Sequence, residues 1–521
     1  MTGALAVQAG ARAALDRAAA LAPEGTGPYA DRLAAAVEAA GTTVQRPDLG
    51  SLVAAVPAGG AERAEAVAAV AAVDDEAVRL RTAVKSRDGF FTTFFISPYS
   101  RYIARWCARR GLTPNQVTTA SLLTALIAAG CAATGERWGY VTAGVLLLVS
   151  FVLDCTDGQL ARYSLQYSTM GAWLDATFDR AKEYSFYAGL ALGAARNGDD
   201  VWALALGAMI LMTCRHVVDF SFNEANHDAT AAGKSVTGSP TAALSDKLDS
   251  VGWTVWVRRM IILPIGERWA MIAVLTAVTS PRTVFYALLA GCAFGALYTT
   301  AGRVLRSVTR KATRTDRAAR ALADLTDTGP LASVLNRGHV RRRPSGVSLG
   351  MALVGSVLMA GAAANNGFGV GWLIATALLY VIAAAEAVSH ALKGPLDWLI
   401  PPLFRFAEYV TILALAAKAD VPGALPAAFG LVAAVAYHHY DTVYRIRGGS
   451  GAPPRWLVWT LGGHEGRVLL TVVLATVLAR DVFPVALTAM AVFVALVVLV
   501  ESIRFWVSSG APAVHDEGEP A

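Results

Sequence analysis

The stretch FVLDCTDGQLARYSLQYSTMGAWLDATFDR, residues 151–180, decides how the rest of this chain is interpreted. It carries four aspartates at helical spacings: Asp154 and Asp157 are three residues apart, and Asp175 and Asp179 are four apart. Each pair therefore lies on one face of a helix. Carboxylates at membrane depth are costly, and four close together repel one another unless a cation lies between them. Two such faces set opposite each other would form an all-oxygen cage for a hard divalent cation such as Mg²⁺.

The full pattern of this stretch is D-x2-D-G-x2-A-R-x8-G-x3-D-x3-D, which resembles the signature of the CDP-alcohol phosphotransferase (CDP-alcohol phosphatidyltransferase) family. The matching positions are Asp154, Asp157, Gly158, Ala161, Arg162, Gly171, Asp175 and Asp179. The resemblance implies a transferase that moves a phosphoryl-alcohol unit from a CDP-alcohol to an acceptor hydroxyl and releases CMP. Snorkelling or paired acids at a membrane surface are the structural alternative. That alternative is weak, because only Arg162 and Arg180 lie within the motif to neutralise four acids.

The resemblance also implies roles for the four aspartates. Asp154, Asp157 and Asp175 would ligate one metal ion, and Asp154, Asp175 and Asp179 would face a second. The expected cofactors are two Mg²⁺ ions, with Mn²⁺ as a substitute. Asp179 would also be the catalytic base that takes the proton of the acceptor hydroxyl.

Several small or polar positions are expected to contact the CDP-alcohol. They are Asn115, Thr118, Gly158, Ala161, Arg162 and Ser168. Gly158 and Ala161 would let a nucleotide approach the helix backbone, and Arg162 can fork onto phosphate oxygens. Gly171 would let the two motif helices close on each other.

The composition predicts an all-α integral membrane protein. The chain has 521 residues, of which 55% are hydrophobic and 16% charged, and its mean hydropathy is +0.46. This is too apolar for a soluble domain of such length, and apolar runs long enough to span a bilayer recur. A first bundle of six spans is expected at 116–135, 139–161, 171–195, 201–222, 268–281 and 283–302. A second bundle of about six is expected at 348–365, 369–389, 403–418, 424–440, 467–480 and 482–506.

Basic residues predict the orientation in the bilayer. They cluster before the first span, between the fourth and fifth, and after the sixth, as at 341–343. Both termini and the Asp motif should therefore face the cytoplasm in a multi-pass protein of the cell membrane. No cleavable signal peptide is expected, because the N-terminus lacks a cationic start followed by an apolar core. The net charge of +6 could attract anionic lipid, but the basic residues are not interleaved with aromatics, so no nucleic-acid partner is expected.

Four regions are expected along the chain: a small Ala-rich cytoplasmic region at 1–92, the catalytic membrane domain at 93–305, a basic cytoplasmic linker at 306–347, and a second membrane bundle of unknown role at 348–521. Within the first region, helical runs are expected near 27–40 and 61–85 and a strand at 51–57.

The stretch KSRDGFFTTFFISPYSRYIARWCARRGLTPNQVT, residues 85–118, resembles the entry segment of the family branch that includes di-myo-inositol-phosphate-phosphate synthases. Residues 98–111 predict an amphipathic surface helix, with Tyr99, Ile103 and Trp106 at helical spacing among arginines.

This entry segment ends in a turn that leads into the first span. By resemblance, Asn115 and Thr118 there would bind the CDP moiety. Helix capping by Thr113 and Asn115 is the alternative, and both interpretations can hold together.

The acceptor site is the least defined by sequence. Lys182 follows the last aspartate, and Arg215 interrupts an apolar run, where an arginine should face a cavity or a partner. Both are acceptor-binding candidates, and Arg215 would suit a phosphorylated acceptor such as an inositol phosphate. Alternatively, Arg215 simply pairs with Asp219, four residues on.

The second bundle has no copy of the Asp motif, yet ionisable residues gather at its predicted cytoplasmic ends. They are Glu386, His390, Arg405, Glu408, His438, His439, Asp441, Arg445, His464, Glu465 and Arg467. Ordinary interfacial side chains are one interpretation, and a polar site or docking surface for the catalytic half is the other. The adjacent His438 and His439 point in different directions on a helix, so they make a weak metal site. The five scattered cysteines are expected to be small apolar residues.

Two function classes compete. The leading one is a CDP-alcohol phosphotransferase, whose acceptor is an inositol phosphate or another polar phosphorylated alcohol. A phospholipid synthase that uses CDP-diacylglycerol is a variant of it. The other class is a multi-span transporter, or an enzyme fused to one, because six plus six spans is a common transporter arrangement. The expected partners are the CDP-alcohol, the acceptor alcohol and the bilayer, and a homodimer is compatible with the sequence.

Overall fold

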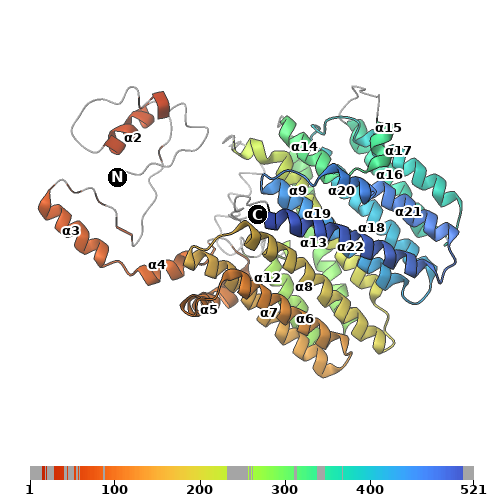
Figure 1. The fold of residues 1–521 in the computed structure, drawn as a ribbon, viewed down its shortest axis with the longest axis horizontal. Coiled ribbons are helices and arrows are strands. Elements are labelled where there is room, and N and C mark those ends of the chain that lie inside the picture. The colour runs from red at the N-terminus through yellow and green to blue at the C-terminus, as the bar shows by residue number, and fades with distance from the viewer. Residues whose placement is uncertain are drawn as a thin grey trace. The chain divides into compact units, whose positions relative to one another are not determined.

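The computed structural model describes residues 59–85, 88–231, 262–309, 314–336, 346–366 and 368–508, and also 15–17, 19, 29–39, 44, 52–53, 55, 57, 256 and 260. The chain forms two compact units, one made largely of Met1–Ala83 and the other of the chain from Val84 onward. Within the described residues every regular element is a helix, so the expected all-α fold is confirmed (Figure 1).

The N-terminal unit contains α2 (Tyr29–Ala39), α3 (Gly60–Ala71) and α4 (Asp75–Thr82). Asp74 caps α4 by accepting a hydrogen bond from the amide of Ala77 at 3.0 Å. These helices match the two helical runs expected there, but the strand expected at 51–57 is wrong. Leu52 and Val53 are exposed and belong to no regular element, and no partner strand exists among the described residues to pair with them.

The first bundle contains the helices that carry the Asp motif (Figure 1). Its elements are a short π-helical turn η2 (Thr92–Ile96), α5 (Ser97–Arg109), α6 (Pro114–Ala133), α7 (Arg137–Ser164), α8 (Thr169–Arg196), α9 (Trp202–Ala231), α12 (Ile265–Val278) and α13 (Pro281–Thr309). Helix α6 packs on both α7 and α8 through small residues. A Cβ added to Gly189 of α8 would lie 2.4 Å from the carbonyl oxygen of Ala129 of α6, so only glycine permits this close approach.

The ends of the motif helices are set by local sequence. Thr113 and Gln116 form a capping box at the start of α6, with Pro114 at its first position. Leu165 ends α7 in a left-handed conformation with φ of 56°. Three residues later Ser168 caps α8 by accepting a hydrogen bond from the amide of Gly171 at 2.9 Å. This short turn reverses the direction of the chain between α7 and α8. The two halves of the motif therefore lie at the same end of the bundle.

The second bundle follows α13. Its elements are α14 (Asp316–Leu325), α15 (Pro330–Leu335), α16 (Gly346–Asn365), α17 (Trp372–Ala387), a 3-10 turn η3 (Asp397–Leu399), α18 (Ile400–Ala419), α19 (Ala424–Arg447), α20 (Arg455–Thr460), α21 (Gly463–Val477) and α22 (Phe483–Ser508). Its buried apolar residues are continuous with those of the first bundle, as where Trp202 of α9 meets Phe429 of α19 with ring centroids 5.6 Å apart.

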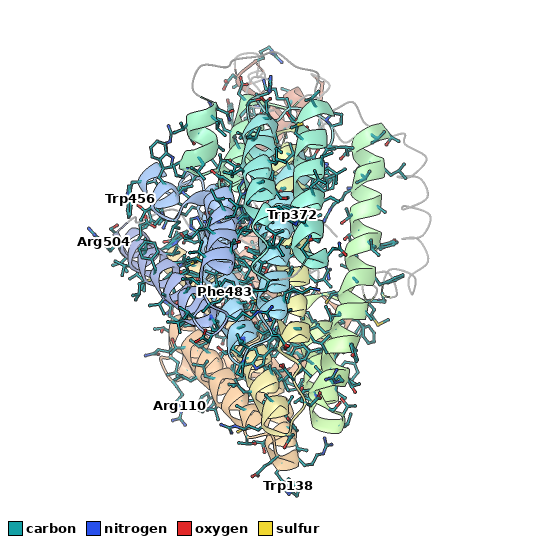
Figure 2. The ribbon with its side chains drawn as sticks, turned by 90° about the vertical axis from the view of Figure 1, so that its right-hand side faces the viewer. Arg110, Trp138, Trp372, Trp456, Phe483 and Arg504 are labelled. Carbon is teal, nitrogen blue, oxygen red and sulfur yellow. The ribbon has the colours of Figure 1, made fainter. Side chains whose placement is uncertain are left out.

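All twelve expected spans correspond to helices. Among the described residues, seven helices are long and apolar enough to cross a bilayer: α6, α7, α9, α13, α16, α18 together with η3, and α22. Helices α8 and α19, of 28 and 24 residues, are also long enough but carry ionisable side chains. The other three, α12, α17 and α21, have 14, 16 and 15 residues. Exposed tryptophans stand near helix starts, Trp138 in α7 and Trp372 in α17, as is typical of membrane interfaces (Figure 2).

Helix α5 has the amphipathic character expected of a surface helix. Tyr99 and Trp106 are exposed, whereas Ala104 and Cys107 are buried against the bundle. The guanidinium of Arg110 lies 5.3 Å from the ring centroid of Trp106. An exposed aromatic face lined by arginines fits a helix that rests in the headgroup region.

The segment expected to be a basic linker contains two helices, α14 and α15, and part of it is buried in the second bundle. A Cβ added to Gly329 would lie 2.2 Å from the carbonyl oxygen of Gly462, so the two chain segments touch backbone to backbone. The carbonyl oxygen of Asp327 accepts a hydrogen bond from the amide of His464 at 3.1 Å.

Asp327, in the turn between α14 and α15, is the centre of a buried ionic network. Its carboxylate lies 2.6 Å from Arg467 and 3.4 Å from Arg405, and it hydrogen-bonds His438 at 3.1 Å. Both arginines also pair with Glu408. Burial by itself would raise the pKa of Asp327, but Arg467, His438 and Arg405 hold that pKa well below its usual range.

Replacing Asp327 with Asn should strongly destabilise the second bundle, because two buried arginines would then share the single charge of Glu408. We expect a loss of about 3–5 kcal/mol in the free energy of unfolding at pH 7, measured by denaturation in detergent. The contribution of Asp327 is complete above the unfolded-state pKa of about 4 and is lost as the pH falls through the lower folded-state pKa. The difference between wild type and Asp327→Asn should therefore shrink below pH 4.

The matched control is Asp316→Asn, since Asp316 pairs with Lys393 at the surface. It should leave stability nearly unchanged. Equal stability of the two variants at pH 7 would contradict a structural role for the Asp327 network.

Candidate functional site

The four aspartates of the motif come together as the sequence predicts. Helix α7 supplies Asp154 and Asp157, and α8 supplies Asp175 and Asp179. Asp154, Asp157 and Asp175 each offer a carboxylate oxygen, and these oxygens lie within 4.8 Å of one another. It is the one group of metal-ligating side chains found in the part of the chain that the structure describes.

Lys182 is the cation that neutralises this group. Its side chain is 1% exposed and bonds to Asp154, and it lies 2.8 Å from Asp179 and 3.2 Å from the hydroxyl of Ser121. The sequence predicts Lys182 as an acceptor-binding residue, whereas in the structure it pairs with two aspartates, which the sequence interpretation does not include. Its position three residues after Asp179 was the available signal, because that spacing puts both on one helix face.

The residues present fit a divalent cation. Oδ2 of Asp157 is buried and has no hydrogen-bond partner among the described residues, and the Asp157 side chain is only 4% exposed. A buried carboxylate oxygen without a donor is costly unless a cation meets it. Lys182 contacts one oxygen each of Asp154 and Asp179, which leaves the other oxygen of each, and the oxygens of Asp157 and Asp175, for a cation of the kind that takes carboxylate ligands.

The residues expected to meet a nucleotide surround this group. A Cβ added to Gly158 would lie 3.4 Å from Nη1 of Arg162, so the guanidinium lies across the glycine. Arg162 is within electrostatic range of Asp157 and of Asp88 in the entry segment. Gly89, next to Asp88, is in close contact with the carboxylate of Glu267, which accepts a hydrogen bond from the amide of Phe91 at 3.3 Å.

Helix capping, one of the two roles expected for the turn before α6, is seen for only one of the two residues proposed for it. Thr113 is the cap of α6, as expected, whereas Asn115 does not cap it. A Cβ added to Gly171 would lie 2.9 Å from Oδ1 of Asn115 and 2.8 Å from Oγ of Ser168. Gly171 therefore allows α8 to approach α6 and not, as expected, α7. Thr118 is buried, and its hydroxyl donates to the carbonyl oxygen of Pro114 at 3.0 Å.

Arg180 lies inside the motif and within electrostatic range of Asp179, but among the described residues it forms no ion pair with a motif aspartate. Its guanidinium bonds to Glu183 at 2.7 Å and lies 5.1 Å from the ring centroid of Tyr440 in the second bundle. Glu183 also lies 3.4 Å from Arg268 and accepts a hydrogen bond from Tyr187 at 2.7 Å. The alternative of motif acids paired by their own arginines is thus not supported for Arg180.

The alternative that Arg215 pairs with Asp219 is wrong. Asp219 forms an ion pair with Arg303 of α13, which local spacing could not predict because the two residues are 84 positions apart. Arg215 instead donates to the carbonyl oxygen of Ile262, and its Nη1 is buried without a hydrogen-bond partner among the described residues. Asp219, Arg268 and Arg303 all lie within electrostatic range of Arg215, but no ion pair joins Arg215 to Asp219 among the described residues.

The ionisable residues of the second bundle are mostly buried and paired, so they are not ordinary interfacial side chains. Besides the Asp327 network, Arg445 lies 2.8 Å from Asp441 and 2.6 Å from Glu501. His438 bonds to Asp327, and its neighbour His439 is also buried, in agreement with the weakness of this pair as a metal site. All five cysteines are free and buried or half-buried.

Replacing Lys182 with Met should lower stability in the absence of divalent cations, because Asp154 and Asp179 would lose their buried counter-charge. We expect a loss of roughly 3 kcal/mol or more in EDTA. Added Mg²⁺ should restore more stability to Lys182→Met than it adds to wild type, since it neutralises the same carboxylates. Thermal denaturation in detergent, with and without Mg²⁺, measures both effects.

Lys418→Met, at an exposed end of α18, is the control and should respond to Mg²⁺ as wild type does. A Lys182→Met protein whose stability in EDTA equals that of wild type would contradict this neutralising role.

Comparison with known proteins gives two family matches. Residues 111–292 match the family described as CDP-alcohol phosphatidyltransferase, and residues 316–521 match a family of unknown function. The chain is 33% identical over 115 residues to an archaetidylinositol phosphate synthase of Pyrococcus horikoshii, covering 22% of this chain and 58% of that protein. It is 42% identical over 84 residues to a bifunctional IPC transferase and DIPP synthase of Rubrobacter xylanophilus, covering 16% and 18%.

A third relative is the phosphatidylinositol phosphate synthase of Mycolicibacterium smegmatis, with 35% identity over 123 residues that cover 23% of this chain and 53% of that protein. The chain thus spans little more than half the length of these relatives, or less.

Proposed function

Because residues 111–292 belong to the CDP-alcohol phosphatidyltransferase family, we propose that this chain transfers a phosphoryl-alcohol unit from a CDP-alcohol to the hydroxyl of an acceptor alcohol and releases CMP. The observation that carries the proposal is the convergence of three aspartate oxygens within 4.8 Å at the junction of α7 and α8. The resemblance of the entry segment and the names of the three relatives favour an inositol phosphate as the acceptor. The donor is either a polar CDP-alcohol or CDP-diacylglycerol, which would make the protein a phospholipid synthase.

In this proposal the four aspartates and Lys182 have separate roles in binding the cations and accepting the proton. Asp154, Asp157 and Asp175 hold a divalent cation, Mg²⁺ or Mn²⁺, and Asp179 faces a second. The cations would supply Lewis-acid stabilisation of the diphosphate and of CMP as the leaving group. Asp179 receives the proton of the acceptor hydroxyl, and Lys182, 2.8 Å away, holds its carboxylate in place on the acceptor side.

The donor side of the site is built for a nucleotide diphosphate. Arg162 lies across Gly158 and can bind two phosphate oxygens at once. Gly158 and Ala161 would leave room for the nucleotide against α7, and Asn115 and Ser168 would offer polar groups around it. Thr118 would line the site from behind, since its buried hydroxyl is bonded to Pro114.

Arg215 is the proposed anchor for the phosphate of the acceptor. Three arginines from three helices, Arg215, Arg268 and Arg303, lie near one another. Glu183 pairs with Arg268 and Asp219 pairs with Arg303, so Arg215 is the member that lacks a carboxylate partner in the described ion pairs. A buried guanidinium nitrogen without an acceptor is suited to an anionic ligand.

Replacing Asp175 with Asn should reduce CMP release by about 10²-fold or more, because one ligand of the charge-stabilising centre is lost. The assay incubates the purified protein with Mg²⁺, a panel of CDP-alcohols and an inositol phosphate. EDTA should have the same effect as the substitution and Mg²⁺ should reverse it.

Asp199→Asn, which breaks a surface pair with Arg282, is the control. Unchanged CMP release in Asp175→Asn would refute the metal-centre proposal, and a wild type that releases no CMP would favour the transporter class.

Replacing Arg215 with Gln should raise the KM for the inositol phosphate by about 10- to 100-fold and leave the KM for the CDP-alcohol nearly constant. A charge-assisted phosphate contact is worth roughly 1.5–3 kcal/mol. Arg282→Gln, at the surface, should change neither constant. A parallel rise of both KM values in Arg215→Gln would argue against a specific acceptor phosphate site.

The orientation remains a proposal that labelling can decide. A cysteine in place of the exposed Ala323 of α14 should resist a membrane-impermeant maleimide in intact cells and react after lysis. A cysteine in place of Glu136, in the turn between α6 and α7, should react in intact cells. The reverse pattern would put the aspartate cluster outside the cell.

A further inference from the structure

Helix α8 has two faces with different partners. Asp175, Asp179 and Lys182 lie on the face that meets the aspartates of α7. Residues 173, 177, 180 and 184 follow one another at spacings of four, three and four, which places them together on the opposite face. The second bundle covers that opposite face.

The contacts to this opposite face come from α19 and α22. The ring of Trp506 in α22 stacks on Trp173 of α8, with centroids 6.1 Å apart and planes 19° apart. Tyr440 of α19 lies under the guanidinium of Arg180, 5.1 Å from it. Tyr437 of α19 lies beside Trp173 and Thr177.

Trp506 is held by hydrogen bonds on the side away from α8. Nε1 of Trp506 donates to Asp441 at 2.8 Å, and the hydroxyl of Ser502 donates to the same carboxylate at 2.7 Å. Arg445 in turn fixes Asp441 through the ion pair already described. These contacts are largely buried, so the position of Trp506 is fixed by hydrogen bonds within the second bundle.

Tyr440 is fixed from the first bundle as well. Its hydroxyl hydrogen-bonds Nδ1 of His216 in α9, and its ring meets Phe220 of the same helix edge to face, with centroids 6.1 Å apart. The rings of Trp506 and Tyr440, which contact α8, are therefore each held in place by a hydrogen bond to another buried or half-buried side chain.

We propose that the second bundle positions helix α8, so that Asp175 and Asp179 stay against Asp154 and Asp157, with Trp506 and Tyr440 as positioning residues. The physical reason is charge repulsion. Four carboxylates on two facing helices repel one another and favour movement of α8 away from α7, and Lys182 compensates only part of that charge. Aromatic contacts on the back of α8 oppose that movement. The consequence for cation binding rests on the proposed function, whereas the mechanical consequence for α8 does not.

The test uses the full-length protein with Trp506→Leu and Tyr440→Leu combined. Loss of the stacking and cation–π contacts should make backbone amides at 169–180 exchange with deuterium roughly tenfold faster. The affinity for Mn²⁺ alone, measured from the electron paramagnetic resonance signal of free Mn²⁺, should fall about five- to tenfold. The Trp506→Phe, Tyr440→Phe protein keeps an aromatic ring at both positions and should recover most of both effects. Trp456→Leu, which removes an exposed tryptophan of α20, should change neither (Figure 2).

The exchange measurement tests whether the second bundle holds α8, and the Mn²⁺ measurement tests whether this holding positions the aspartates. Unchanged exchange at 169–180 in the double Leu variant overturns the proposal. Faster exchange with unchanged Mn²⁺ affinity also overturns it, because the bundle would then support α8 without positioning the acids. A wild type that binds no Mn²⁺ contradicts the proposed metal centre, while the exchange comparison still decides whether α8 is held. If the double variant does not fold, Trp506→Leu and Tyr440→Leu as single substitutions give the same comparison.

Discussion

The rest of this structure depends on the mutual repulsion of four carboxylates set between two helices inside a membrane bundle. Four unpaired carboxylates facing one another across α7 and α8 would repel strongly. One buried lysine reaches Asp154 and Asp179, and a buried oxygen of Asp157 has no donor among the described residues. We propose that this incomplete compensation holds the acids together and still leaves a place for a divalent cation.

The helices around the cluster are arranged to keep it in register. Ser168 starts α8 three residues after α7 ends, Gly171 allows α8 to approach Asn115, and Gly189 brings α8 against α6. Glu183 of α8 forms a further buried ion pair with Arg268 of α12. The second bundle adds a rigid aromatic surface behind the same helix, through Trp506 and Tyr440. Catalytic region and second bundle therefore share one buried core.

The sequence predicts the helices and the acidic cluster because both depend on local spacing. The twelve expected apolar runs each correspond to a helix of the two bundles, and the spacing of the four aspartates puts each pair on one face. The pairings between helices were not predictable in this way. Asp219 with Arg303, Arg180 with Tyr440 and Asp327 with Arg467 join residues that are 84, 260 and 140 positions apart. The strand expected at 51–57 is wrong for a related reason, since β-structure needs a partner that a short apolar run does not reveal.

The central claim is that the aspartates of α7 and α8 hold a divalent cation that contacts a nucleotide diphosphate. Pulsed electron paramagnetic resonance on Mn²⁺ bound to the purified protein, with CDP added, tests this claim most directly. The account predicts a phosphorus-31 coupling from the diphosphate to the bound Mn²⁺ that disappears in Asp157→Asn. Bound Mn²⁺ without phosphorus coupling, or an identical coupling in Asp157→Asn, would contradict it.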